Sequence, residues 1–70
     1  MPENLTNEED HHKENVIFLI GQYGNRLNKD TIEKTYQDMR SRYKYARIRI
    51  YVPLLAMRNT KELLSYLAGL

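Results

Sequence analysis

The most informative stretch of the chain runs from Ala46 to Met57 and reads ARIRIYVPLLAM. Basic and apolar residues alternate at its start, and its last eight residues carry no charge. Such a long apolar segment in a chain of 70 residues must be buried against something. The stretch therefore tells more about architecture and association than about chemistry.

Two structures fit residues 47–52, in the first half of this stretch. Their alternation is typical of a short strand, and a lone strand would need a second copy of the chain to pair with. The alternative is a tight connection into a helix that has Pro53 in its first turn, where a missing N–H does no harm. The apolar spacing that follows Ile50 favours the helix.

The segment before residue 24 is predicted to form a first helix over residues 8–23. Acidic residues in its first turn complement the positive end of the helix dipole, and its apolar residues recur on one face. Gly24 is expected to end this helix in a left-handed conformation, which glycine adopts without a steric penalty.

The clearest helical pattern of the chain lies in residues 31–45. The apolar stripe of this second helix, which extends to the residue after it, consists of Ile32, Tyr36, Met39, Tyr43 and Ala46. Asp30 is the expected N-cap, with Glu33 three residues later as in a capping box.

These elements predict an all-α fold, a compact three-helix bundle with helices at 8–23, 31–45 and 51–67. Residues 7–70 would form the single domain, behind a disordered acidic arm over residues 1–6. The expected core is Val16, Leu19, Ile20, Tyr23, Ile32, Tyr36, Met39, Tyr43, Leu54, Met57, Leu64 and Leu67.

Small size and the absence of cysteine favour oligomerisation. A chain of this length gains little stability from its own core, and without cysteine it forms no disulfide or zinc–thiolate site. A partner subunit is the remaining source of stability, so we expect a homodimer.

Charge is distributed unevenly along the chain. The first 14 residues hold five acidic residues against one lysine, a net −4, and residues 15–70 hold ten Lys/Arg against four acidic residues, a net +6. No apolar run is long enough for a signal peptide or a membrane span. We therefore expect a cytoplasmic protein without a membrane partner.

No arrangement of residues predicts catalysis, a cofactor or a metal site, so we expect no enzymatic activity. His12 lies four residues after Glu8, on the same helix face, but no third ligand is near. The pair His11–His12 is therefore interpreted as part of a solvated first turn.

Five cations lie within ten residues and are interleaved with tyrosines, a pattern that suits phosphate contacts and base stacking. These candidate nucleic-acid contacts are Arg40, Arg42, Lys44, Arg47 and Arg49. A small dimeric nucleic-acid-binding regulator is therefore the alternative function, less favoured because the acidic N-terminal segment would cover the cations.

The tail of the chain resembles a family of small bacterial proteins known as three-helix bundle dimerisation domains. The resemblance covers roughly residues 15–67 and is carried by the core Tyr51-Val52-Pro53-Leu54-Leu55 and the charged, leucine-containing segment after it. It implies a dimeric bundle without catalytic residues. A similar bundle precedes arsenate-reductase-like phosphatases, whose cysteine-containing phosphate loop this chain lacks.

The favoured function is a non-enzymatic association module that forms a homodimer and docks another protein as a further role. The predicted dimer interface consists of Ile50, Tyr51, Val52, Leu54 and Leu55. A strand at residues 47–52 would favour the nucleic-acid alternative, and a helix start would favour association.

Overall fold

The computed structural model describes the backbone of residues 3–69 and the side chains of residues 8–69. Its elements are helix α1 (Glu3–Tyr23), helix α2 (Lys29–Ser41), the 3-10 turn η1 (Arg49–Tyr51) and helix α3 (Val52–Gly69). No strand occurs between residues 3 and 69. The predicted all-α fold with three helices is therefore confirmed.

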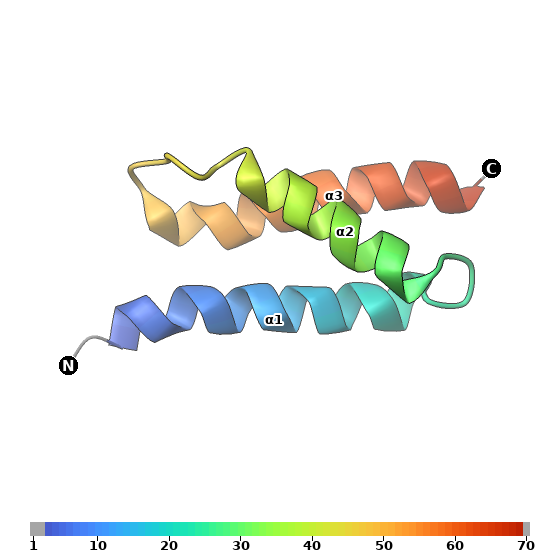
Figure 1. Ribbon diagram of the computed structural model, residues 1–70, viewed down its shortest axis with the longest axis horizontal. Helices are drawn as coiled ribbons and strands as arrows, with labels where there is room; N and C mark the ends of the chain where they lie inside the picture. Colours follow the sequence, from blue (N-terminus) through green and yellow to red (C-terminus); the bar gives the residue numbers. More distant parts are fainter. Residues whose placement is uncertain (1–2, 70) are drawn as a thin grey trace.

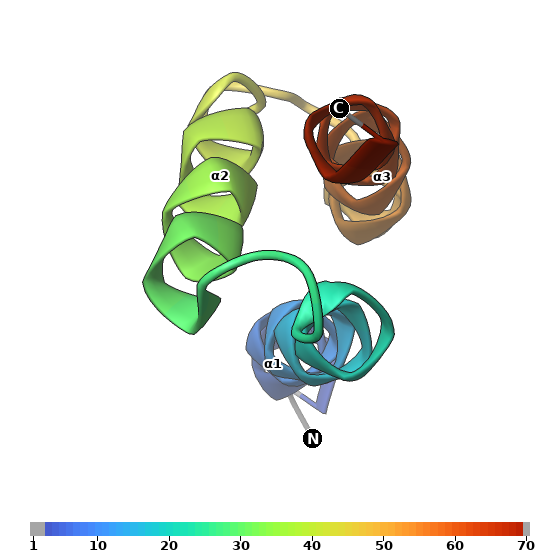
Figure 2. The same cartoon turned by 90° about the vertical axis from the view of Figure 1, so that its right-hand side faces the viewer.

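The two long helices, α1 and α3, run in the same direction, and the shorter α2, which lies between them in the sequence, runs in the opposite direction (Figure 1). Seen end-on, the three helices occupy the corners of a triangle, with α2 on one side of the α1–α3 pair (Figure 2). The molecule measures 43 × 19 × 15 Å, so it is a short rod. One long face of this rod is formed by α1 and α3 without α2.

The core consists of apolar side chains from all three helices. Its fully buried members are Leu19, Ile32, Tyr36, Ala56 and Leu64, and the partly buried residues packed against them are Val16, Ile20, Tyr23, Leu27 and Met57. Most of the predicted core is therefore confirmed. The other half-buried members of the predicted core are Met39 and Tyr43.

Two predicted core residues, Leu54 and Leu67, lie instead at the surface, with 63% and 37% of their area exposed. The buried positions of α3 recur every three or four residues, as one helix face requires. Leu54 falls between two of these positions, Pro53 and Ala56, and so points away from the bundle.

Helix α1 starts earlier than the sequence pattern indicated. It begins at Glu3 rather than near residue 8, so the arm predicted for residues 1–6 overlaps the helix from Glu3 on, and residues 1 and 2 lie outside the described part. Acidic residues near a helix start are favourable for its dipole, which is consistent with this extension.

Helix α2 is shifted by two to four residues from its predicted bounds. Asn28, not Asp30, is the N-cap, and its side chain accepts a hydrogen bond from the backbone N–H of Asp30 at 2.9 Å. The helix ends at Ser41, because the next backbone N–H groups bond three residues back, as those of Tyr43 and Lys44 do. Such bonds tighten the chain into turns.

The prediction of a left-handed turn at Gly24 is wrong, because no glycine of the described chain has a positive φ. Glycine is required there for space. A Cβ at Gly24 would clash with the backbone carbonyl oxygen of Ile20, to which the N–H of Gly24 donates at 2.8 Å.

The ambiguous segment forms a helix start. Arg49–Tyr51 is a 3-10 turn that runs directly into α3, and Pro53 lies in the first turn of that helix, as the helical alternative predicted. Residues 42–48, the connection, link α2 to this turn and carry no regular helix or strand.

Candidate association surface

Four large apolar side chains are exposed at the start of α3. The exposed fractions are 62% for Ile48, 78% for Ile50, 55% for Tyr51 and 63% for Leu54. These residues, which we call the association surface, lie within seven positions of one another in the chain. Single exposed apolar residues are ordinary on proteins, whereas such a group is typical of an interaction site.

Three of the five predicted interface residues, Ile50, Tyr51 and Leu54, belong to this surface. Val52 is fully buried in the bundle and Leu55 is half-buried, so Val52 has no surface to offer a partner. Ile48 was not among the predicted residues. The alternation of basic and apolar residues over 47–52 is the feature of the sequence that could have indicated Ile48.

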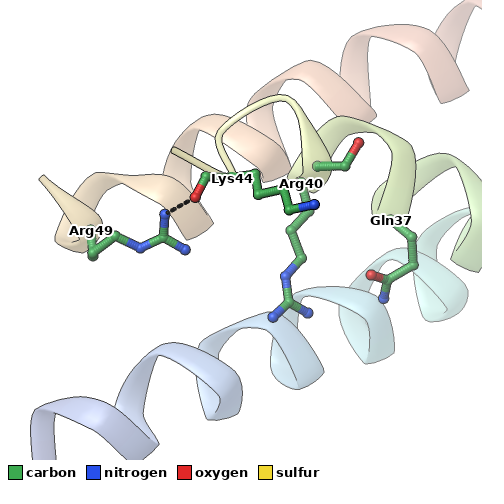
Figure 3. Close-up of a pocket in the computed structure, with 5 residues that line it drawn as sticks. Gln37, Arg40, Lys44 and Arg49 are labelled. Carbon is green, nitrogen blue, oxygen red and sulfur yellow. Dashed lines mark hydrogen bonds between the residues drawn. The ribbon is translucent and has the colours of Figure 1, made fainter. Parts of the chain in front are cut away.

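Arg49 holds the connection in place beside this surface. Its guanidinium donates to both carboxylate oxygens of Glu8 on α1, at 2.7 and 3.3 Å. It also donates to the backbone carbonyl of Tyr43 at 2.9 Å. A further hydrogen bond, of 3.1 Å, runs to the carbonyl of Lys44 (Figure 3). One side chain from η1 thus joins the connection to α1.

The hydrogen bonds between Arg49 and Glu8 stabilise the charged form of each group. Those from Arg49 are the main cause that lowers the pKa of Glu8, and those to Glu8 raise the pKa of Arg49. A carboxylate that accepts charge-assisted hydrogen bonds resists protonation. Glu8 therefore keeps its negative charge into the acidic range.

A buried polar network extends from Glu8 into the core. His12 Nε2 lies 3.4 Å from Glu8 Oε2, and His12 Nδ1 lies 2.6 Å from the hydroxyl of Tyr36 on α2. The side-chain amide of Asn15 donates to the same hydroxyl at 2.9 Å and to the carbonyl of Pro53 on α3 at 3.1 Å. The network thus joins all three helices.

A neutral His12 ring completes this network. When the ring proton is on Nε2, facing Glu8, Nδ1 accepts from the Tyr36 hydroxyl, which in turn accepts from Asn15. Burial lowers the pKa of His12, and the positive charge of Arg40 acts in the same direction. Burial also raises the pKa of Tyr36.

The order carboxylate, imidazole and hydroxyl is the order of an acid–base relay. The hydroxyl belongs to Tyr36, however, and this side chain is fully buried. A substrate has no access to it, so the arrangement is suited to stabilising the bundle. Asn15, whose role the sequence did not indicate, completes the network.

The interpretation of both histidines as solvated is wrong for His12, of which only 1% is exposed. His11 is exposed as expected. His12 precedes Val16 by four residues and Leu19 by seven, so it lies on the apolar face of α1. That spacing was the signal in the sequence.

The five candidate nucleic-acid contacts do not form one continuous surface. Arg40, Lys44 and Arg49 line one shallow hollow together with Gln37 and Ser41 (Figure 3). Two of these cations are engaged, since Arg40 pairs with Glu9 and Arg49 with Glu8.

The other two candidate contacts lie elsewhere. Arg42 lines a separate hollow between α2 and α3, and Arg47 is exposed in the connection. Glu8 and Glu9, in the acidic N-terminal half of α1, thus neutralise two of the five cations. The acidic charge of the first 14 residues predicted this effect.

The comparisons with known proteins add no relative. No protein-family model matches the chain, and neither a curated protein nor a solved structure is significantly similar to it. The resemblance to three-helix bundle dimerisation domains therefore stays a prediction.

Two features are absent from the described residues. None of the described helices is long and apolar enough to cross a membrane. Among the described side chains, no group of three His, Cys, Asp or Glu residues could hold a metal ion.

Proposed function

We propose that the protein is an association module that forms a homodimer through the association surface, Ile48, Ile50, Tyr51 and Leu54. The observation that carries the proposal is the exposure of all four side chains by more than half. Docking of another protein on the same surface is a further role of the module.

The energetics of a small bundle support association. Apolar area removed from water stabilises a fold by about 25 cal/mol per Å². Apolar side chains that stay exposed on a single copy contribute none of this stabilisation. A chain of 70 residues has a small core, and the fully buried apolar side chains of its described part are Leu19, Ile32, Tyr36, Val52, Ala56 and Leu64. A second copy on the association surface would add burial that a single bundle lacks.

The test compares two variants of α3 by sedimentation velocity over a wide concentration range. Leu54→Asp places a charge in the association surface and should weaken the dimer without unfolding the bundle. Tyr66→Asp is the matched control, since Tyr66 is similarly exposed at 66% but lies twelve residues, about 18 Å, further along the helix.

A folded, monomeric Leu54→Asp variant beside a dimeric control would support the proposal. Equal dimerisation of both variants would contradict it, as would a wild type that stays monomeric. Circular dichroism of each variant establishes that the helices are intact.

The alternative function, binding of nucleic acid, is favoured by one observation, the three cations around a single hollow. It stands second because two of the three already pair with carboxylates of α1. Affinity for DNA or RNA through these residues would fall steeply with salt. Absence of binding at low salt would contradict this alternative.

A further inference from the structure

The association surface is surrounded by positive charge. Residues 39–61, which contain it, hold seven Lys or Arg residues and no Asp or Glu. Arg49 is neutralised by Glu8, but Arg47 precedes Ile48 directly and Arg58 follows Leu54 by one helical turn. Both of these arginines are exposed. The surface is therefore apolar at its centre and cationic at its edges.

This distribution disfavours a dimer in which the association surface contacts itself. A two-fold axis through the surface would bring Arg47 and Arg58 of both copies together, and like charges across an interface oppose binding. A stable interface also buries about 800 Å² on each partner, which is more than four side chains supply. The complementary surface must be larger and acidic.

The outer face of α1 has this character. Asp10, Glu14 and Phe18 follow one another at intervals of four residues, so they lie along one stripe of the helix. Both carboxylates are exposed, and so is Phe18, to 51%. Unlike Glu8 and Glu9, which pair with arginines of the same copy, these two acidic residues point outward.

Phe18, at the end of the stripe, and the association surface border the same long face of the rod. The amide of Asn15 on α1 reaches the carbonyl of Pro53 on α3 at 3.1 Å, so these residues lie at the same height. Further along, the ammonium of Lys61 lies 5.1 Å from the centre of the Phe18 ring. Helix α2 lies on the other side of this helix pair (Figure 2).

Because α1 and α3 run in the same direction (Figure 1), a two-fold axis parallel to them sets α1 of each copy against α3 of the other. This two-fold rotation leaves the position of every residue along the rod axis unchanged. The acidic stripe of one copy then faces the start of α3 in the other, and both contacts form at once.

We propose that the association surface of one copy is covered by α1 of a second copy, with Asp10 and Glu14 opposite Arg47 and Arg58. This inference rests on the proposed homodimer and specifies its geometry. Phe18 adds apolar contact beside Leu54 of the second copy, so the interface extends over both helices. The uneven charge of the chain is then what makes one copy complementary to another.

Two charge-reversed variants test this arrangement. Asp10→Lys/Glu14→Lys makes the stripe basic, and Arg47→Glu/Arg58→Glu makes the edges of the association surface acidic. Each alone should dimerise about tenfold more weakly or worse, because like charges now face each other. Mixed together, they should form a heterodimer of near wild-type affinity, since opposite charges meet at both contacts.

The matched control is Glu33→Lys/Asp38→Lys on α2, which changes the net charge equally but lies off the proposed interface. Mixing this variant with Arg47→Glu/Arg58→Glu should not improve association. Sedimentation velocity gives the affinities, and circular dichroism establishes folding. If a reversed pair does not fold, Asp10→Asn/Glu14→Gln should weaken the dimer and reduce its dependence on salt.

The outcomes separate this inference from the proposed function. A wild-type dimer whose reversed variants are not rescued by mixing would overturn the arrangement and leave the homodimer standing. Rescue by the α2 control would also overturn it, because net charge alone would then explain association. A monomeric wild type would overturn both.

Discussion

His12 shows how one polar residue can join three helices. Its ring contacts Glu8 on its own helix and Tyr36 on α2, and Tyr36 shares its hydroxyl with Asn15, which reaches α3. A buried polar group stabilises a fold only if its hydrogen bonds are satisfied. No buried side-chain nitrogen or oxygen of the described residues lacks a partner, so this network meets that condition.

Protonation of His12 should destabilise the bundle. Its folded pKa is lowered, so below about 6.5, the ordinary value for histidine, the unfolded chain takes up a proton that the folded chain resists. The free energy of unfolding should therefore fall as the pH falls from 6.5 toward the lowered pKa. The charged groups facing the ring are Glu8 and Glu9 on α1 and Arg40 on α2.

Urea unfolding at several pH values measures this dependence. His12→Leu should lose about 1–3 kcal/mol at neutral pH, because the Tyr36 hydroxyl loses its acceptor, and its stability should no longer change in this pH window. His11→Leu, at an exposed position, should keep the wild-type dependence. Equal pH profiles for the wild type and His12→Leu would contradict this role.

Two glycines of the first helical region should respond oppositely to alanine. A Cβ at Gly21 would meet no atom within 4 Å, and Gly21→Ala should stabilise the protein by about 0.5–1 kcal/mol, as expected inside a helix. Gly24→Ala should destabilise it by about 1–3 kcal/mol, because the Cβ meets backbone at Ile20. Thermal unfolding followed by circular dichroism measures both; stabilisation by Gly24→Ala would show that this end of α1 relaxes freely.

The connection between α2 and η1 receives several hydrogen bonds from one side chain, that of Arg49. Residues 42–48 lack regular structure, and Arg49 supplies hydrogen bonds to three of their carbonyls while it pairs with Glu8 on α1. The connection leads into the association surface, so its position determines where that surface lies. Arg49 therefore has a structural role that its composition-based assignment to nucleic acid did not indicate.

Replacing Arg49 with Gln should release the connection. Trypsin should then cut the chain after Lys44 and Arg47 several times faster, whereas global stability should change little, as is usual for an exposed ion pair. Arg26→Gln, in the loop at the other end of the rod, is the control. Unchanged cleavage rates would mean that the carbonyl contacts of Arg49 do not hold the connection.

Helices whose apolar residues recur at regular spacing were predicted well from the sequence. The ends of these helices and their polar contacts were predicted less well. The stripe that includes Ile32 and Tyr36 identified α2, because burial of one helix face imposes that spacing. Its N-cap was missed because Asn28 and Asp30 both suit a helix start, and only tertiary packing selects between them. Leu54 was misplaced because two apolar stripes follow Pro53, and the sequence alone does not say which faces the bundle.

The candidate site was predictable in part for a similar reason. The apolar character of Ile50 and Tyr51 is visible in the sequence, but their exposure depends on η1, which turns them outward before Val52 enters the core. The pairing of Glu8 with Arg49 joins residues 41 positions apart, and no local pattern indicates such a contact.

At the scale of the whole molecule, the chain is a short rod with one long face formed by α1 and α3 alone (Figure 2). Its charge is divided between an acidic N-terminal half of α1 and a basic segment around the association surface. Part of this charge is matched within one copy, by the pairs of Glu8 and Glu9. The proposed homodimer matches the remainder between copies and covers the exposed apolar side chains.

The most direct measurement is the mass of the wild-type protein by light scattering over a wide range of concentrations. We expect the mass to rise with concentration from that of one chain, 8.4 kDa, to twice that value, and to stop there because a two-fold interface is closed. A mass of 8.4 kDa at every concentration would contradict the homodimer, and the association surface would then have to serve a different partner.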